Sequence, residues 1–365
     1  MRSFLPVRAL ASVLCPLVGA VAFTFGAGHA RAADPEPAPA PATAPDKAKD
    51  APAPPPEDKT SADKQKDDKP KDTAGGAVPE LAFERFTLDN GLDVILHQDA
   101  RLPVACVDVW YHVGAFHEDA GRTGFAHLFE HLMFQGTPHV PGDSHFKLLE
   151  QAGASFTNGT TDFDRTNYFE VVPKNELELA LWLESDRMGW LMQGVDQAKL
   201  DEQRKVVKNE RRQSVENAPY GLADEKLWQA MFPPAHPYWG YVIGSMADLD
   251  SASLADVRAF YDTYYAPSNA TLVIAGDIDT AQTKALVRKY FDTLPKWTKP
   301  AGKTVAPPAL TQEVRVDAVD AVAQLPRVQV QYFTPPMFAP GAADLEVLAG
   351  VLVSLTSSST GLRMT

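Results

Sequence analysis

Two histidines lie four residues apart in the segment AHLFEHL at positions 126–132, and a glutamate directly precedes the second of them. On an α-helix, residues i and i+4 lie one above the other on the same face, so His127 and His131 can bind one ion together. Neutral imidazole is a preferred ligand of zinc, and two of them leave room for a third protein ligand and a water. The carboxylate of Glu130 would lie beside this pair, where it could take a proton from that water.

An ordinary structural role is the alternative for these residues, since a single histidine on a helix is usually a core or surface residue. The surroundings argue against that alternative. The neighbouring residues are mostly large and apolar, so a polar trio among them needs a reason. The pattern H-x-x-E-H is also rarely met by accident in a chain with nine histidines among 365 residues. Metal chemistry is therefore the favoured interpretation.

A catalytic zinc with two histidine ligands normally has one more protein ligand, which is often a carboxylate. The strongly charged segment 196–217 offers several acids, and Glu210 is the candidate among them. The sequence leaves other carboxylates open, because spacing between separate helices fixes no distance. These alternatives are Glu202, Glu216, Glu176 and Glu184.

The first 32 residues have the composition of an export signal peptide. Arg2 and Arg8 give a basic start, residues 9–28 are apolar and small, and residues 30–32 (ARA) fit an A-x-A cleavage site. A retained membrane anchor is the alternative, but the many Gly and Ala residues of the apolar run favour cleavage. We expect an exported protein of the periplasm or cell envelope, which would contact a membrane only through an uncleaved signal segment.

Residues 33–78 are rich in Pro, Ala, Lys and Asp and contain almost no large apolar residue, which predicts a disordered linker. The formal charge of the chain is −13, and it becomes −16 without residues 1–32, which hold three arginines and no acid. This acidic balance argues against nucleic acid as a partner. Cys106 is the only cysteine after the signal segment, so a sizeable core rather than an internal disulfide has to hold the fold.

Residues 79–298 have the pattern of one globular domain that mixes strands with long helices. A D-N-G turn at 89–91 is a strong hairpin signal. Hairpins without strict βαβ alternation predict an α+β fold, a two-layer domain of antiparallel-rich mixed sheet covered by helices. Residues 299–308 are expected to be a linker, and residues 309–365 the start of a second, similar domain that is incomplete. The expected strands are 83–88, 92–97, 104–113, 154–161, 166–172, 271–275 and 328–333, and the expected helices 121–135, 144–151, 175–190, 196–217, 253–265 and 280–294.

A set of motifs in this chain resembles one known family. The motifs are GFAHLFEHLMFQGT at 124–137, a glycine-rich segment before an Asn, TNYF at 166–169, RKVVKNE at 204–210, HPY at 236–238 and GDI at 276–278. In order and spacing they are similar to the pitrilysin (insulinase-like) zinc metallopeptidases, the inverzincins with H-x-x-E-H. That family includes the mitochondrial processing peptidases and many bacterial envelope proteins. The resemblance covers residues 80–345 and is specific as a set.

The resemblance implies a role for each residue of the candidate site. His127 and His131 would bind Zn²⁺, Glu130 would be the general base, and Glu210 would be the third metal ligand. Members of the family often carry a second glutamate seven residues before the metal-binding one. Here that position is Gln203, whose amide can hydrogen-bond a ligand but adds no charge.

The resemblance also implies that Asn158 and Gly159 belong to an edge strand that pairs with the backbone of a peptide substrate. From the residues alone, the Asn-Gly pair would be interpreted as a bulge or turn. The family continues through a second domain, whereas here the resemblance fades after residues 345–348. We expect a truncated or frame-shifted reading frame, or a chain whose partner supplies the other half.

The sequence as a whole predicts a zinc-dependent endopeptidase that hydrolyses peptides or small unfolded proteins by a metal-activated water with a glutamate base. The alternative is a non-catalytic or half-site subunit that binds peptides and needs a partner, either a second copy or another subunit. A zinc-stabilised structural domain is disfavoured, because no fourth Cys or His stands at short spacing.

Overall fold

The computed structural model describes residues 81–306 and 310–356, with the backbone alone for residues 352–356. The predicted signal segment, the predicted linker at 33–78 and the last nine residues lie outside this part of the chain. Among the described residues, no helix is both long enough and apolar enough to cross a membrane. The predicted domain boundaries stay predictions.

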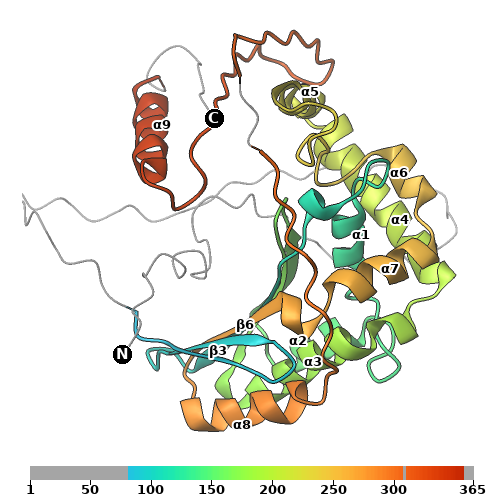
Figure 1. Cartoon of the computed structure of the whole chain (residues 1–365), viewed down its shortest axis with the longest axis vertical. Helices are drawn as coiled ribbons and strands as arrows, with labels where there is room; N and C mark the ends of the chain where they lie inside the picture. Colours follow the sequence, from blue (N-terminus) through green and yellow to red (C-terminus); the bar gives the residue numbers. More distant parts are fainter. Residues whose placement is uncertain (1–80, 307–309, 357–365) are drawn as a thin grey trace, which may run out of the picture. The chain divides into compact units, whose positions relative to one another are not determined.

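A six-stranded mixed sheet is the framework of the domain (Figure 1), with the strand order β1-β2-β6-β3-β5-β4. Strands β2 and β6 are parallel, and every other neighbouring pair is antiparallel. The strands are β1 (Glu84–Thr87), β2 (Asp93–Gln98), β3 (Val104–Tyr111), β4 (Phe156–Thr161), β5 (Thr166–Pro173) and β6 (Ala270–Gly276). The antiparallel-rich mixed sheet expected from the sequence is confirmed, and β4 forms one edge of it.

Alternating burial explains why these segments form strands. In β3 the side chains of Ala105, Val107, Val109 and Tyr111 are fully buried, while those between them are only partly covered. Successive side chains of a strand point to opposite faces, so this alternation places one face of the sheet against the core. The hairpin between β1 and β2 turns at Gly91, whose φ of 95° lies in the left-handed region that favours glycine.

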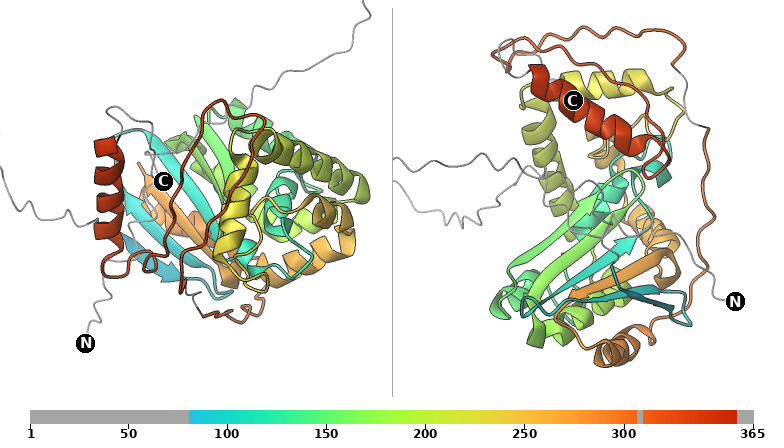
Figure 2. Two further views of the ribbon diagram at one scale, coloured as in Figure 1. Left: turned by 90° about the horizontal axis from the view of Figure 1, so that it is seen from above. Right: turned by 90° about the vertical axis from the view of Figure 1, so that its left-hand side faces the viewer.

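Helices cover the buried face of the sheet (Figures 1 and 2). Helix α3 packs against β3 and β5, α8 packs against α3, and α1 packs against β4 and β5. The helices are α1 (Phe125–Leu132), α2 (Ser144–Gln151), α3 (Leu177–Gly194), α4 (Gln197–Arg211), α5 (Gly221–Met231), α6 (Met246–Ser251), α7 (Leu254–Tyr264), α8 (Thr280–Phe291) and α9 (Ala342–Thr356). A single π-helical turn, η4 (Arg212–Glu216), extends α4. The α+β fold class is therefore confirmed.

Three of the sequence expectations differ from the structure. The helix expected at 121–135 is only α1, because Gly124 holds a left-handed backbone with a φ of 87° and the helix begins after it. Helices α5, α6 and α9 were not expected. The strand expected at 328–333 is wrong: this segment has no neighbouring strand within the described chain, and strand pairing needs such a partner. Its alternating apolar side chains are exposed instead, and they are Val328, Val330 and Tyr332.

Candidate metal and active site

Helix α1 carries the H-x-x-E-H segment, and two carboxylates from other parts of the chain fix where it begins. Glu118 accepts hydrogen bonds from the backbone N–H groups of Gly124 (3.0 Å) and Ala126 (2.8 Å). Asp248, in α6, accepts from the backbone N–H of Thr123 at 3.1 Å and from its hydroxyl group. The first N–H groups of a helix have no partner inside the helix, and carboxylates stabilise this end. These contacts set the start of α1 and with it the position of the histidines.

His127, His131 and Glu210 converge on one point between α1 and α4. The Nε2 atom of His131 lies 3.2 Å from one carboxylate oxygen of Glu210, and that of His127 lies 3.6 Å from the other. One ligand atom from each of the three residues lies within 4.8 Å of the others. Each side chain keeps some exposure, from 12% for His127 to 33% for Glu210. Helix periodicity thus places the histidines together, and the packing of α1 against α4 adds the acid.

The charges at this point suit a metal ion. Burial and the neighbouring His131 lower the pKa of His127 to about 4, so its imidazole is neutral and can bind a cation. Burial disfavours a charge on His131, but its contact with Glu210 and the negative charges of Glu130 and Glu210 outweigh burial and raise its pKa. Burial acts against ionisation of Glu210, and the two histidines more than offset it, so its pKa is lowered. The donor set of two imidazoles and one carboxylate is one that zinc prefers.

Gln203 lies on the same face of α4 as Glu210, two turns earlier, and is buried. Gln203 contributes to the raised pKa of His131, and an amide at this position can support a neighbouring histidine by hydrogen bonding. After Glu210, Arg211 donates to both carboxylate oxygens of Glu225 in α5, at 2.8 and 3.0 Å. This end of α4 is therefore fixed from both sides.

The other carboxylates that the sequence left open lie apart from the histidine pair. Glu202 is exposed on α4, and Glu216 lies 3.6 Å from Arg211. Glu176 accepts a hydrogen bond from Asn175, and Glu184, in α3, is fully buried. Among the described residues, only Glu210 joins the two histidines in a group with metal-ligand spacing.

Glu130 is partly buried beside the histidine pair, and the hydroxyl group of Thr161 donates to its Oε2 atom at 2.5 Å. Burial raises the pKa of Glu130 to about 7, and this hydrogen bond acts in the opposite direction. Gly159 faces the same side chain. A Cβ atom on Gly159 would lie 3.1 Å from the Cγ atom of Glu130 and 3.2 Å from ring atoms of Phe134 and Tyr168. Glu130 is therefore in contact with β4 at Gly159 and Thr161.

Asn158 and Gly159 lie inside β4, where they pair with Phe169 and Tyr168 of β5. They form neither the turn nor the bulge that the residues alone suggested. Because β4 is the edge strand of the sheet, one side of its backbone has no strand partner within the described chain. The predicted pairing with a peptide stays a prediction.

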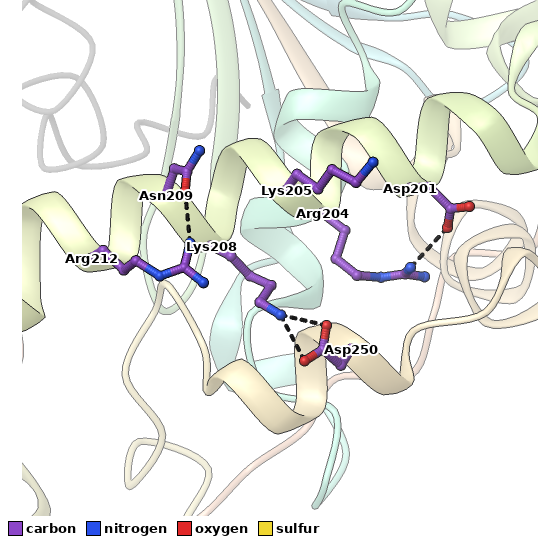
Figure 3. A pocket seen from close by; sticks show the side chains of 7 residues that line it. All are labelled: Asp201, Arg204, Lys205, Lys208, Asn209, Arg212 and Asp250. Atoms are coloured by element: carbon purple, nitrogen blue, oxygen red, sulfur yellow. Dashed lines mark hydrogen bonds and ion pairs between the residues drawn. The ribbon is translucent and has the colours of Figure 1, made fainter.

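The outer face of α4 carries a shallow pocket that is not part of this site (Figure 3). Its side chains pair with one another: Arg204 donates to Asp201 at 2.8 Å and Lys208 to Asp250 at 2.6 Å. The residues of this face recur every three or four positions, and Glu210 lies about 200° around the helix from Lys208. The lining residues are Asp201, Arg204, Lys205, Lys208, Asn209, Arg212 and Asp250.

A second group of metal-binding residue types, His145, Glu170 and Glu184, is buried between α2, β5 and α3. Arg187 donates to both carboxylate oxygens of Glu184 and so already supplies a positive charge. Burial raises the pKa of Glu170 well above its usual range and lowers that of His145, so both are neutral. No net charge is left for a metal to balance, and we interpret this cluster as a structural ion pair.

Sequence reasoning missed Thr161, Glu118 and Asp248. Strand alternation could have placed Thr161 on the same face as Gly159, but no pattern showed which helix that face meets. Glu118 and Asp248 reach α1 from six and more than a hundred residues away. Their contacts depend on tertiary packing that spacing does not encode.

Comparisons with known proteins show which family the chain is similar to. Residues 93–235 match the model of the family described as insulinase (peptidase family M16), and residues 251–362 match the model of the peptidase M16 inactive domain. The zinc protease PqqE of Helicobacter pylori is 32% identical over 212 residues, which cover 58% of this chain and 47% of that protein. The probable zinc protease PqqL of Escherichia coli K12 is 28% identical over 270 residues, which cover 67% and 27%.

Solved structures give the same result for the fold. A protease from Helicobacter pylori superposes with a TM-score of 0.58 and 32% identity, over 61% of this chain and 53% of that one. Pitrilysin, at 20% identity, superposes with a TM-score of 0.57 over 64% of this chain and 25% of its own. The chain spans about half, or less, of the length of the relatives it matches.

Proposed function

This chain belongs to the insulinase family of peptidases (family M16), and on that premise we propose that it is a zinc-dependent endopeptidase. The observation that carries the proposal is the meeting of His127, His131 and Glu210 at one point, with Glu130 beside them. A three-ligand site of this kind leaves a coordination position open for water or substrate, which distinguishes catalytic from structural zinc sites.

His127, His131 and Glu210 would hold the zinc ion. When bound there, zinc would lower the pKa of a water molecule and polarise a peptide carbonyl group. Gln203, which is buried on the same face of α4 as Glu210, would support this role as an amide neighbour of His131. The neutral imidazole of His127 needs to lose no proton before it binds the ion.

Glu130 would transfer a proton from the attacking water to the departing amine. Its Oε2 atom is held by Thr161, which leaves Oε1 to accept a proton from the attacking water and to deliver it to the departing amine. Burial raises the pKa of this carboxyl group to about 7 when no ion is bound. A zinc ion beside it would lower that pKa and favour the base form, which accepts the proton first. The same group therefore acts as base and then as acid.

Strand β4 is the proposed substrate strand. Asn158 and Gly159 lie at its middle, and Glu130 packs over Gly159. An extended peptide that adds to this edge would place its backbone next to the base, and it would be held by main-chain hydrogen bonds that do not depend on its sequence. We propose peptides and small unfolded proteins as substrates, because only an extended chain can pair in this way.

We propose that the protein is exported to the periplasm or cell envelope. The basic and apolar start of the sequence supports export, and one E. coli relative is described as a periplasmic protease. Cell fractionation with N-terminal sequencing tests this proposal: a chain in the periplasmic fraction that starts near Ala33 supports it, and a cytoplasmic chain that starts at Met1 contradicts it.

A second candidate function is that of a half-site subunit, which needs a second copy or another protein to close over the peptide. Large apolar side chains gather on the exposed surface of the segment 310–351 and favour this candidate. The most exposed of them are Val319 (103%), Tyr332 (79%) and Met337 (78%). Peptidase activity of the purified chain as a monomer, with its monomeric state verified by size-exclusion chromatography, would argue against it.

The test of the proposed function is a Glu130→Gln variant assayed on a quenched-fluorescent peptide. The amide keeps the shape of the side chain but cannot take up a proton. We expect hydrolysis to fall by roughly a hundredfold to ten-thousandfold, with the zinc content unchanged. A chelator should abolish wild-type activity, and added zinc should restore it. Wild-type rates in Glu130→Gln would show that another group is the base.

A further inference from the structure

We propose that Thr161 is a positioning residue for the general base, and that it ties the placement of Glu130 to the strand that would receive the peptide. The inference rests on the proposed function and adds a residue to it. Its starting point is the hydrogen bond from the Thr161 hydroxyl group to Oε2 of Glu130. At 2.5 Å it has the length of a hydrogen bond between a hydroxyl group and a carboxylate.

This contact fixes the orientation of the base without using up its reactive oxygen. A hydroxyl group donates one proton, so Thr161 occupies Oε2 and leaves Oε1 of Glu130 free. When Oε1 gains a proton, Oε2 can still accept the same hydrogen bond. Thr161 can therefore hold the carboxyl group in one rotamer through both halves of the reaction. Such placement can raise the reaction rate greatly, because a reacting group that is about 1 Å out of place can lower the rate about a hundredfold.

Thr161 is itself held rigidly. It pairs with Thr166 across the β4–β5 ladder. The hydroxyl group of Thr166 in turn donates to the backbone carbonyl of Val113 at 2.9 Å, just after β3. Two neighbouring strands therefore define where the Thr161 hydroxyl group lies. A site supported by strands is more precise than one supported by a mobile loop.

The neighbouring threonine on β4 has a different contact. The hydroxyl group of Thr160 donates to the side-chain oxygen of Asn167 at 2.5 Å and lies away from Glu130. Gly159 and Thr161, two positions apart, share the face toward α1, as strand alternation requires. A slip of β4 by one residue would turn the Thr161 hydroxyl group to the other face. The register of β4 thus determines both the position of Glu130 and the position of the strand edge that is proposed to bind the peptide.

The experiment compares Thr161→Val, which keeps the shape and removes the hydroxyl group, with Thr161→Ser, which keeps the hydroxyl group. Both are assayed on the quenched-fluorescent peptide with full zinc occupancy verified by metal analysis. We expect Thr161→Val to lower kcat by roughly tenfold to a hundredfold, with KM within about twofold of wild type and zinc content unchanged. Thr161→Ser should stay within about threefold of wild-type kcat. The matched control is Thr263→Val, an exposed threonine on α7, which should match wild type.

Two kinetic results would overturn the inference while wild type stays active and Glu130→Gln inactive. One is a Thr161→Val variant with wild-type kcat. The other is an equal loss in Thr161→Val and Thr161→Ser, which would indicate packing of the methyl group. An inactive zinc-loaded wild-type chain would instead reject the proposed function, and with it the catalytic role of Thr161.

A measurement that does not depend on catalysis distinguishes failure of this inference from failure of the proposed function. The unfolding equilibrium of wild type, Thr161→Val, Glu130→Ala and the double variant forms a cycle that isolates the hydroxyl–carboxylate contact. We expect the two substitutions to be coupled by at least about fivefold in the unfolding equilibrium constant. Additive effects within about twofold would show that the contact is absent, whatever the activity.

Discussion

Packing alone can explain why position 159 is a glycine, without reference to a substrate. Its Cα faces Glu130, and any Cβ atom there would press on the Cγ atom of the base and on two aromatic rings. Its φ is not in the left-handed region, so the tight space rather than the backbone conformation favours glycine there. Gly159 is thus part of the packing around Glu130.

A Gly159→Val substitution should therefore displace Glu130. We expect kcat on the peptide to fall by roughly tenfold to a hundredfold, while zinc content stays close to wild type because the metal ligands lie on α1 and α4. Steady-state kinetics with metal analysis checks both. The matched control is Gly302→Val, where an added Cβ atom has open space. An active Gly159→Val variant would show that this contact does not position the base.

At the scale of elements, the start of α1 is stabilised by a residue that lies outside this helix. Glu118 satisfies two backbone N–H groups at its start, a task that a side chain directly at the helix start usually performs. Gly124, which stands at that position, has no side chain that could accept a hydrogen bond. The side chain of Glu118, six residues before Gly124, replaces the missing cap.

Glu118→Ala should leave these N–H groups buried without acceptors. We expect the free energy of unfolding to fall by about 1–3 kcal/mol, and the affinity for zinc to fall as well, because the first turn of α1 holds His127. Urea unfolding and a zinc titration measure the two effects. Glu178→Ala removes an exposed ion pair with Lys289 and should leave the free energy of unfolding almost unchanged. Equal effects of both substitutions would contradict the capping role.

The spacing of His127 and His131 could be interpreted from the sequence because it depends only on the geometry of one helix. The hairpin at 89–91 and the strands of the sheet were also predictable, since alternation and turn residues are local signals. The strand expected at 328–333 failed because pairing needs a neighbour that a local pattern does not reveal. Thr161 was missed because its contact with Glu130 depends on how β4 meets α1.

At the scale of the whole molecule, the candidate site is a product of tertiary assembly. Glu210 is 79 residues after His131 in the sequence, and only the packing of α4 against α1 brings them together. The resemblance to a known family pointed to Glu210, whereas the residues alone left four other acids open. The chain also spans half or less of the length of its relatives, so the enclosure of a bound peptide is a separate question from the metal site.

Zinc analysis of three purified proteins tests the central claim that α1 and α4 together form the metal site. The proteins are wild type, Glu210→Ala and Glu202→Ala, dialysed against the same zinc-buffered solution. Glu202 is the matched control, because it is an exposed acid on the same helix. We expect about one zinc per chain in wild type and in Glu202→Ala, and a large loss in Glu210→Ala, which lacks one of three ligands. Full zinc occupancy in Glu210→Ala would contradict the account.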